Sequence, residues 1–115
     1  MNEITDIWFR CASGLEELGT QIGLQHIEAD AENVWEWITG SFGPYRLDIT
    51  RMHRVTPATT DTRIFLLGDE RVFPQALSDA LIQRLRAATI APIHLGRWVY
   101  ITGEEYEKVV VETVK

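Results

Sequence analysis

The chain has little cysteine, little positive charge and no long apolar run, and each shortage excludes a class of protein. Its single cysteine, Cys11, cannot close an internal disulfide, which fits a reducing compartment. No apolar run approaches the roughly 18 residues that cross a bilayer, and no basic-then-apolar leader precedes Ile4. A formal net charge of −6 opposes nonspecific binding to nucleic acid or to an anionic membrane. We therefore predict a soluble, cytoplasmic protein that binds neither nucleic acid nor a membrane.

Motifs that would indicate an enzyme, a cofactor or a metal are also lacking. The histidines His26, His53 and His94 fall on three predicted strands, without the spacing of a metal motif. Cys11 precedes a helix N-terminus, where the helix dipole favours a thiolate, but the sequence identifies no histidine partner for it. We therefore predict no catalytic residue, no metal site and no cofactor.

The composition that is present suits one folded domain. Hydrophobic residues make up 45% and charged residues 24% of the 115 residues, which is ordinary for a globular protein. This length is sufficient for a core without metals or disulfides. We predict a single α+β domain spanning residues 1–115.

Alternating and helical patterns predict the element order β-α-β-β-β-β-α-β-β. Strands are predicted over residues 4–10, 24–29, 34–39, 45–55, 63–67, 93–101 and 106–114. A single helix through residues 29–38 is the alternative to the first hairpin. Consecutive strands with short turns favour a mainly antiparallel sheet, with two amphipathic helices on one face. In the first strand, Ile7 and Phe9 should share one face, and Asp6 and Trp8 the other.

Local signals place the ends of the two helices. Ser13 and Glu16 match a capping box, in which each side chain satisfies a backbone N–H of the first turn. Gly23 can adopt the left-handed conformation that ends a helix. Pro74 suits the first turn of the second helix, which should end before Pro92.

The acidic residues are concentrated in the first part of the chain. Residues 1–48 hold nine acids and two arginines, whereas residues 49–101 hold four acids and seven arginines. The segment 28–36 places four carboxylates beside two tryptophans: Glu28, Asp30, Glu32 and Glu36, with Trp35 and Trp37. On a strand, the two tryptophans share one face and Glu36 lies on the other. Such a segment suits a basic partner, because tryptophans anchor interfaces and carboxylates steer cations.

The predicted C-terminal hairpin repeats this combination of aromatic and acidic side chains. Trp98, Tyr100 and Tyr106 lie near Glu104, Glu105 and Glu107. If the two hairpins are neighbours, their acids would form one negative surface with aromatic anchors.

A short acidic domain without a catalytic motif, rich in tryptophan (Trp35, Trp37, Trp98) and in the acids of segment 28–36, is similar to a class of bacterial protein. It resembles the small immunity proteins that neutralise contact-dependent or polymorphic toxins. The resemblance implies an α+β fold and a carboxylate surface that covers the active site of a basic toxin domain, such as a nuclease. No diagnostic motif is matched, so no family residue is transferred.

The predicted function is therefore inhibition of a basic toxin domain by an acidic, tryptophan-containing surface. The residues predicted to bind the partner are Glu28, Asp30, Glu32, Trp35, Glu36, Trp37, Glu104 and Glu105. One alternative is a small hydrolase or transferase that uses Cys11 or the histidines. Another is a subunit of a homo-oligomer that associates through its aromatic hairpin.

Overall fold

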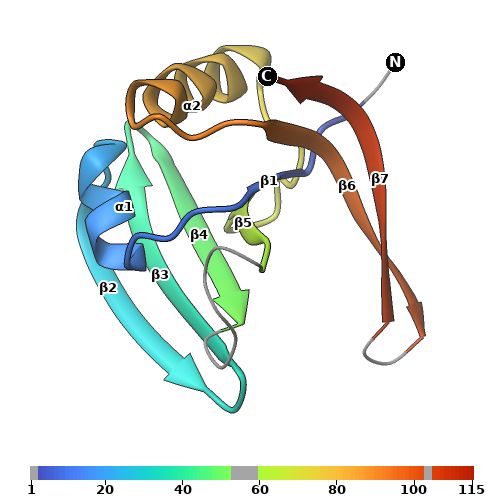
Figure 1. The fold of residues 1–115 in the computed structure, drawn as a ribbon, viewed down its shortest axis with the longest axis horizontal. Helices are drawn as coiled ribbons and strands as arrows, with labels where there is room; N and C mark the ends of the chain where they lie inside the picture. Colours follow the sequence, from blue (N-terminus) through green and yellow to red (C-terminus); the bar gives the residue numbers. More distant parts are fainter. Residues whose placement is uncertain (1–2, 53–59, 103–104) are drawn as a thin grey trace.

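The computed structural model describes residues 3–52, 60–102 and 105–115, which form one antiparallel sheet with two helices against it (Figure 1). The strands are β1 (Asp6–Phe9), β2 (Gln25–Glu32), β3 (Trp35–Phe42), β4 (Tyr45–Met52), β5 (Thr62–Leu66), β6 (Ile93–Thr102) and β7 (Glu105–Val114). The helices are α1 (Leu15–Gln21) and α2 (Gln75–Ala87). The predicted α+β class and element order are confirmed.

The sheet has the strand order β2-β3-β4-β5-β1-β6-β7. Strands β2 to β5 follow one another as neighbours, and β6 and β7 form a hairpin at the other end. The N-terminal strand β1 is inserted between β5 and β6, although these strands come much later in the sequence. The two hairpins that carry the tryptophan-rich segments therefore lie at opposite edges of the sheet (Figure 1).

One face of the sheet carries the apolar core, and both helices pack on it. As predicted, Ile7 and Phe9 of β1 point into this core, and Asp6 and Trp8 occupy the other face of the strand. All four residues are buried, because β1 is central and both of its faces are covered. The other main members of the core are Leu15, Leu18, Ile22, Ile38, Leu47, Ile49, Ile64, Leu66, Leu77, Leu81, Leu85, Ile93 and Leu95.

Helix α1 ends as predicted but does not begin as predicted. Gly23 has a φ of 89°, and it follows the C-cap residue Ile22. The prediction of a capping box at Ser13 is wrong, because the helix begins one residue later than that motif requires. Gly14 is the N-cap and forms no side-chain capping bond, while the carbonyl oxygen of Ser13 accepts a hydrogen bond from Arg51.

Helix α2 is amphipathic, as predicted. Leu77, Leu81 and Leu85 are buried against the sheet. Pro74 is the N-cap rather than a residue of the first turn, so the predicted start is wrong by one position. Within the described ranges, neither helix has the length and apolar composition of a membrane span.

The hairpin β2–β3 replaces the alternative of one helix through residues 29–38, which is wrong. Its turn is at Asn33 and Val34 rather than at residues 30–33, and Asn33 has a φ of 57°. A single side chain with positive φ is tolerated best when it is asparagine, aspartate or glycine. His53, residues 54–59 and Glu104 lie outside the described residues.

Candidate functional site

The face of the sheet opposite the helices, which we call the open face, carries polar and aromatic side chains. Cross-strand register aligns one residue of each strand in a row over this face. From β2 to β7 the row is Asp30, Trp37, Thr50, Arg63, Trp8, His94 and Thr113. Directly opposed side chains in neighbouring strands are close enough to interact. The register therefore places an acid, two indoles and a guanidinium on one surface.

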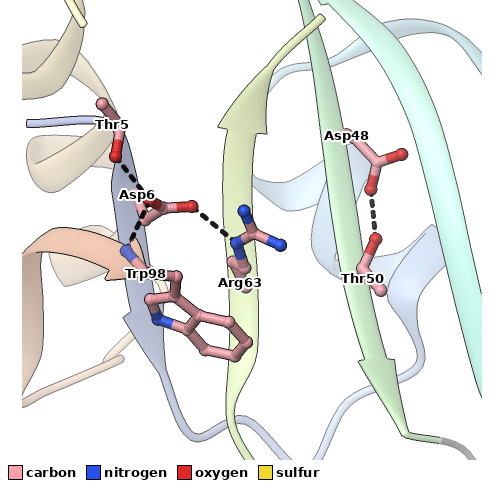
Figure 2. A network of polar contacts seen from close by, with 6 residues as sticks. All are labelled: Thr5, Asp6, Asp48, Thr50, Arg63 and Trp98. Carbon is pink, nitrogen blue, oxygen red and sulfur yellow. Dashed lines mark hydrogen bonds and ion pairs between the residues drawn. The ribbon is translucent and has the colours of Figure 1, made fainter. Parts of the chain in front are cut away.

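A buried ion pair organises the centre of the open face. Asp6 is 2% exposed, and its Oδ1 accepts a hydrogen bond of 2.5 Å from Nε of Arg63. Its Oδ2 accepts bonds from Oγ1 of Thr5 at 2.6 Å and from the backbone N–H of Trp98 at 2.9 Å (Figure 2). One carboxylate thus connects β1 to both of its neighbours, β5 and β6.

Aromatic rings hold the guanidinium of Arg63 in place. Its Cζ lies 4.3 Å from the ring centroid of Phe65 and 4.8 Å from that of Trp98. Trp98 in turn contacts Trp8 edge-on, at 6.2 Å between ring centroids, and Tyr106 at 5.6 Å. Arg63 is therefore fixed by an ion pair and by cation–π contacts together.

A β-bulge interrupts the pairing of β6 and β7 close to Trp98. The register of β6 and β7 shifts between Leu95 and Gly96, which opposes Val110. A Cβ at position 96 would lie 1.9 Å from the carbonyl oxygen of Val109, so only glycine fits there. The close approach of the two backbones explains this glycine.

Beside this cluster the open face is hollow. A pocket of about 290 Å³ is lined by Trp35, Trp37, Asp48, Thr50, Asp61, Arg63, Trp98 and Tyr106. These residues come from β3, β4, β5, β6 and β7, with Asp61 directly preceding β5. Ligand sites are typically concave and mostly apolar, with a small number of polar groups that fix orientation. The aromatic rings and carboxylates of this pocket have that character.

Two carboxylates line the pocket, and their surroundings differ. Asp61 pairs with Nζ of Lys108, and its Oδ1 lies 4.0 Å from Nε of Arg10. Asp48 accepts a hydrogen bond from Oγ1 of Thr50 (Figure 2) and forms no salt bridge within the described part of the chain. Burial raises the pKa of Asp48 above its ordinary value of 3.8, and the Thr50 hydrogen bond and the charge of Arg63 oppose that rise. Asp48 is thus a partly desolvated carboxylate without a salt-bridge partner among the described residues.

The raised pKa of Asp48 gives a prediction on stability. Between the ordinary pKa of 3.8 and the higher folded-state pKa, the folded protein binds more protons than the unfolded chain. Stability contributed by Asp48 therefore falls as the pH rises through this window, and its ionised form destabilises the fold at pH 7. We expect Asp48→Asn to raise the free energy of unfolding at pH 7 and to lose this advantage near pH 3.8.

Urea unfolding of both proteins at a series of pH values measures this effect. The carboxamide of Asp48→Asn keeps an oxygen that can accept the Thr50 hydrogen bond. A variant that is less stable than the wild type at pH 7 would contradict the expectation.

Three of the acids predicted to bind a partner lie on the open face. Glu28, Asp30 and Glu32 alternate along the edge strand β2, and all three are exposed. Asp30 is directly opposite Trp37, and Glu32 is directly opposite Trp35. The acids therefore border the side of the pocket that the two tryptophans form.

Glu36 lies on the opposite face, away from these tryptophans. Its Oε1 accepts a 2.6 Å hydrogen bond from Nε of Arg51, a buried residue that is 4% exposed. Nη1 of Arg51 also donates to the carbonyl oxygens of Cys11 at 3.2 Å and Ser13 at 2.7 Å. Glu36 is thus engaged within the protein and does not extend the acidic edge.

The two tryptophan-rich hairpins are not neighbours in the sheet, yet their rings line the same pocket. Trp35 and Trp37 come from β3, and Trp98 and Tyr106 come from β6 and β7. Glu105 is the first residue of β7, and Glu104 lies outside the described residues. Glu107 is exposed and lies directly opposite Val99, on the other face of the hairpin from Trp98 and Tyr106, so it does not join the acids of β2.

The residues considered for catalysis do not come together where the structure describes them. Cys11 is buried, His26 is exposed on β2, and the ring of His94 packs 5.8 Å from that of Trp8. The described residues contain no group of three or more histidine, cysteine, aspartate or glutamate side chains that could hold a metal ion. The sequence did not single out Asp48 or Arg63, because neither residue belongs to a recognisable motif.

Comparison of the chain with protein-family models, curated proteins and solved structures gives no match. The functional inference therefore depends on the open face itself.

Proposed function

We propose that the chain is a binding protein that docks a basic protein through its open face. The observation that carries this proposal is the adjacency of three exposed carboxylates on β2 to a half-buried aromatic pocket. Glu28, Asp30 and Glu32 supply negative charge in water, where it steers a cationic partner. Trp35 and Trp37 supply large rings that are partly exposed and suit the anchor role in an interface.

The partner that suits this surface best is a toxin domain with a cationic cleft. Alternate residues of a strand are about 6.8 Å apart, so the three acids form a regular row of negative charges. Such a row is what a nucleic-acid backbone presents to a nuclease. We therefore propose a cytoplasmic immunity protein of bacterial origin, which occludes the active site of a basic nuclease-type toxin.

The test is charge reversal on β2 with a matched control. The triple variant is Glu28→Lys, Asp30→Lys, Glu32→Lys. Its control is a second triple variant with lysine at three other acids, Asp69, Glu70 and Asp79, which changes the net charge by the same amount. The control residues are also exposed, but they lie after β5 and on α2. We expect the β2 triple to slow association with a basic nuclease-type toxin domain, chosen as a candidate partner from the genes around this one, by about tenfold or more at low salt.

Stopped-flow mixing at several salt concentrations measures the association rate constant. The difference between the two triples should shrink as the ionic strength rises, because salt screens exposed charges. Equal rates for the two triples would remove β2 as the docking edge. Failure of the wild-type protein to inhibit the toxin domain would overturn the proposed function.

A second candidate function, self-association, is favoured by apolar exposure on the C-terminal hairpin. Val99 and Ile101 of β6 are 42% and 56% exposed. Exposed apolar patches commonly mark protein contacts. Light scattering over a range of concentrations separates the candidates, because the monomer mass is 13.2 kDa and a dimer has twice that mass.

A further inference from the structure

The pocket on the open face is lined by a carboxylate, that of Asp48, which has no salt bridge within the described part of the chain. Asp61 already has Lys108 and Arg10 near it, as described above. Asp48 is bonded to the hydroxyl of Thr50, which carries no charge. A partly buried carboxylate in this situation gains most from a cation that can enter the pocket.

Arg63 is the nearest internal candidate for that cation, and it is engaged elsewhere. Its Nε is bonded to Asp6 at 2.5 Å, and its guanidinium lies over the rings of Phe65 and Trp98. Figure 2 shows Arg63 on β5 and Asp48 on the neighbouring strand β4, with the ion pair of Arg63 directed toward β1. Arg63 lowers the pKa of Asp48 through its charge but forms no salt bridge with it in the described structure.

The walls of the pocket are aromatic on both sides. Trp35 and Trp37 form one side, and Trp98 and Tyr106 form the other. Aromatic faces attract cations through the negative potential over the ring, and tryptophan does so most strongly. A carboxylate between aromatic walls therefore suits a cationic group.

We infer that this pocket binds one guanidinium group, the side chain of an arginine on the partner protein, with Asp48 as its counter-charge. A guanidinium suits the pocket better than an ammonium does. It is planar, stacks on rings and is weakly hydrated, so it enters an aromatic site with less loss of solvation. The chain already holds Arg63 in this way, between a carboxylate and two rings. The volume of about 290 Å³ is at the lower end for ligand sites and is sufficient for one side chain.

The inference rests on the proposed function for the source of the arginine, but the pocket can be tested without any toxin. The probe is N-acetyl-arginine amide, and the readouts are tryptophan fluorescence and the indole N–H signals in NMR spectra. Its matched control is N-acetyl-citrulline amide, which has a similar shape and no charge. We expect saturable binding of the arginine probe and binding at least about tenfold weaker for the citrulline probe.

Asp48→Asn and Asp69→Asn are the protein variants for this titration. We expect Asp48→Asn to weaken binding of the arginine probe by about tenfold or more. It should remain folded, because removing a desolvated charge is expected to stabilise the protein at pH 7. Asp69 is exposed and does not line the pocket, so Asp69→Asn should bind as the wild type does.

Three outcomes would overturn the inference: no saturable binding of the arginine probe, equal binding to Asp48→Asn, or equal affinity for N-acetyl-lysine amide. Failure of the pocket and failure of the proposed function are distinguishable. If the wild type and Asp48→Asn inhibit the toxin domain to the same extent, the proposed function is supported and the role of the pocket in it is contradicted. Binding of the arginine probe without inhibition of the toxin domain would leave the pocket standing and remove the function.

Discussion

Asp6→Ala is expected to lower the free energy of unfolding by about 3–5 kcal/mol, because it breaks a buried ion pair and leaves one charge behind. Asp6 is 2% exposed and accepts bonds from Thr5, Arg63 and the backbone of Trp98. Its loss leaves the guanidinium of Arg63 without a counter-ion and the N–H of Trp98 without an acceptor. Urea unfolding with an unchanged m-value would measure the effect.

A double-mutant cycle with Arg63→Met separates the ion pair from the other contacts of Asp6. The double variant has no orphaned charge, so it should lose less stability than the sum of the two single variants. Substitution of the exposed Asp69 by alanine is the control and should change stability by no more than about 0.5 kcal/mol. A loss below about 1 kcal/mol for Asp6→Ala would show that the buried pair contributes little.

Arg51→Ala is expected to have an effect of similar size, about 3–5 kcal/mol, on the other face of the sheet. Arg51 is 4% exposed and bonds to Glu36 and to the carbonyl oxygens of Cys11 and Ser13. It therefore fixes the segment between β1 and α1 onto β4. Its removal leaves one carboxylate and two carbonyl groups without that donor.

Two further variants sharpen this test. Arg51→Lys keeps the charge but loses the branched donor group, so its stability should lie between those of the wild type and Arg51→Ala. Arg97 is an exposed arginine on β6, and Arg97→Ala should cost no more than about 0.5 kcal/mol. Equal stabilities for Arg51→Ala and Arg97→Ala would contradict the structural role of Arg51.

These contacts divide the acidic segment into two parts with different roles. Glu36 stabilises the fold through Arg51 on the core side of the sheet. Glu28, Asp30 and Glu32 lie exposed on the open face. Substitutions at Glu36 should therefore act on stability, and those on β2 on the encounter with a partner.

The sequence predicted the elements well because their signals are local. Alternation of side chains separated the two faces of β1 and placed Trp35 and Trp37 together. The spacing of Leu77, Leu81 and Leu85 by four residues indicates the buried side of α2. These patterns extend over a few residues and depend only on the period of a strand or a helix.

The partners across the sheet were harder to predict, because register depends on the position of each turn. The turn at Gly43 and Pro44 aligns Glu36 with Arg51, so this pair could have been predicted from the sequence. The predicted turn at residues 30–33 was too early, and a shift of register moves side chains to other partners. The pairing of Asp6 with Arg63 joins residues 57 positions apart, and no local pattern predicts it.

The position of β1 in the sheet has a consequence for folding. Its partners are β5 and β6, so Ile7 meets Ile64, and Trp8 meets His94. During synthesis, β1 cannot pair with β5 and β6 until most of the chain has left the ribosome. Contacts between residues so far apart in sequence form slowly, and the apolar side chains of the waiting strand remain exposed meanwhile. Until β5 and β6 have formed, β1 is therefore a segment to which a chaperone could bind or at which aggregation could start.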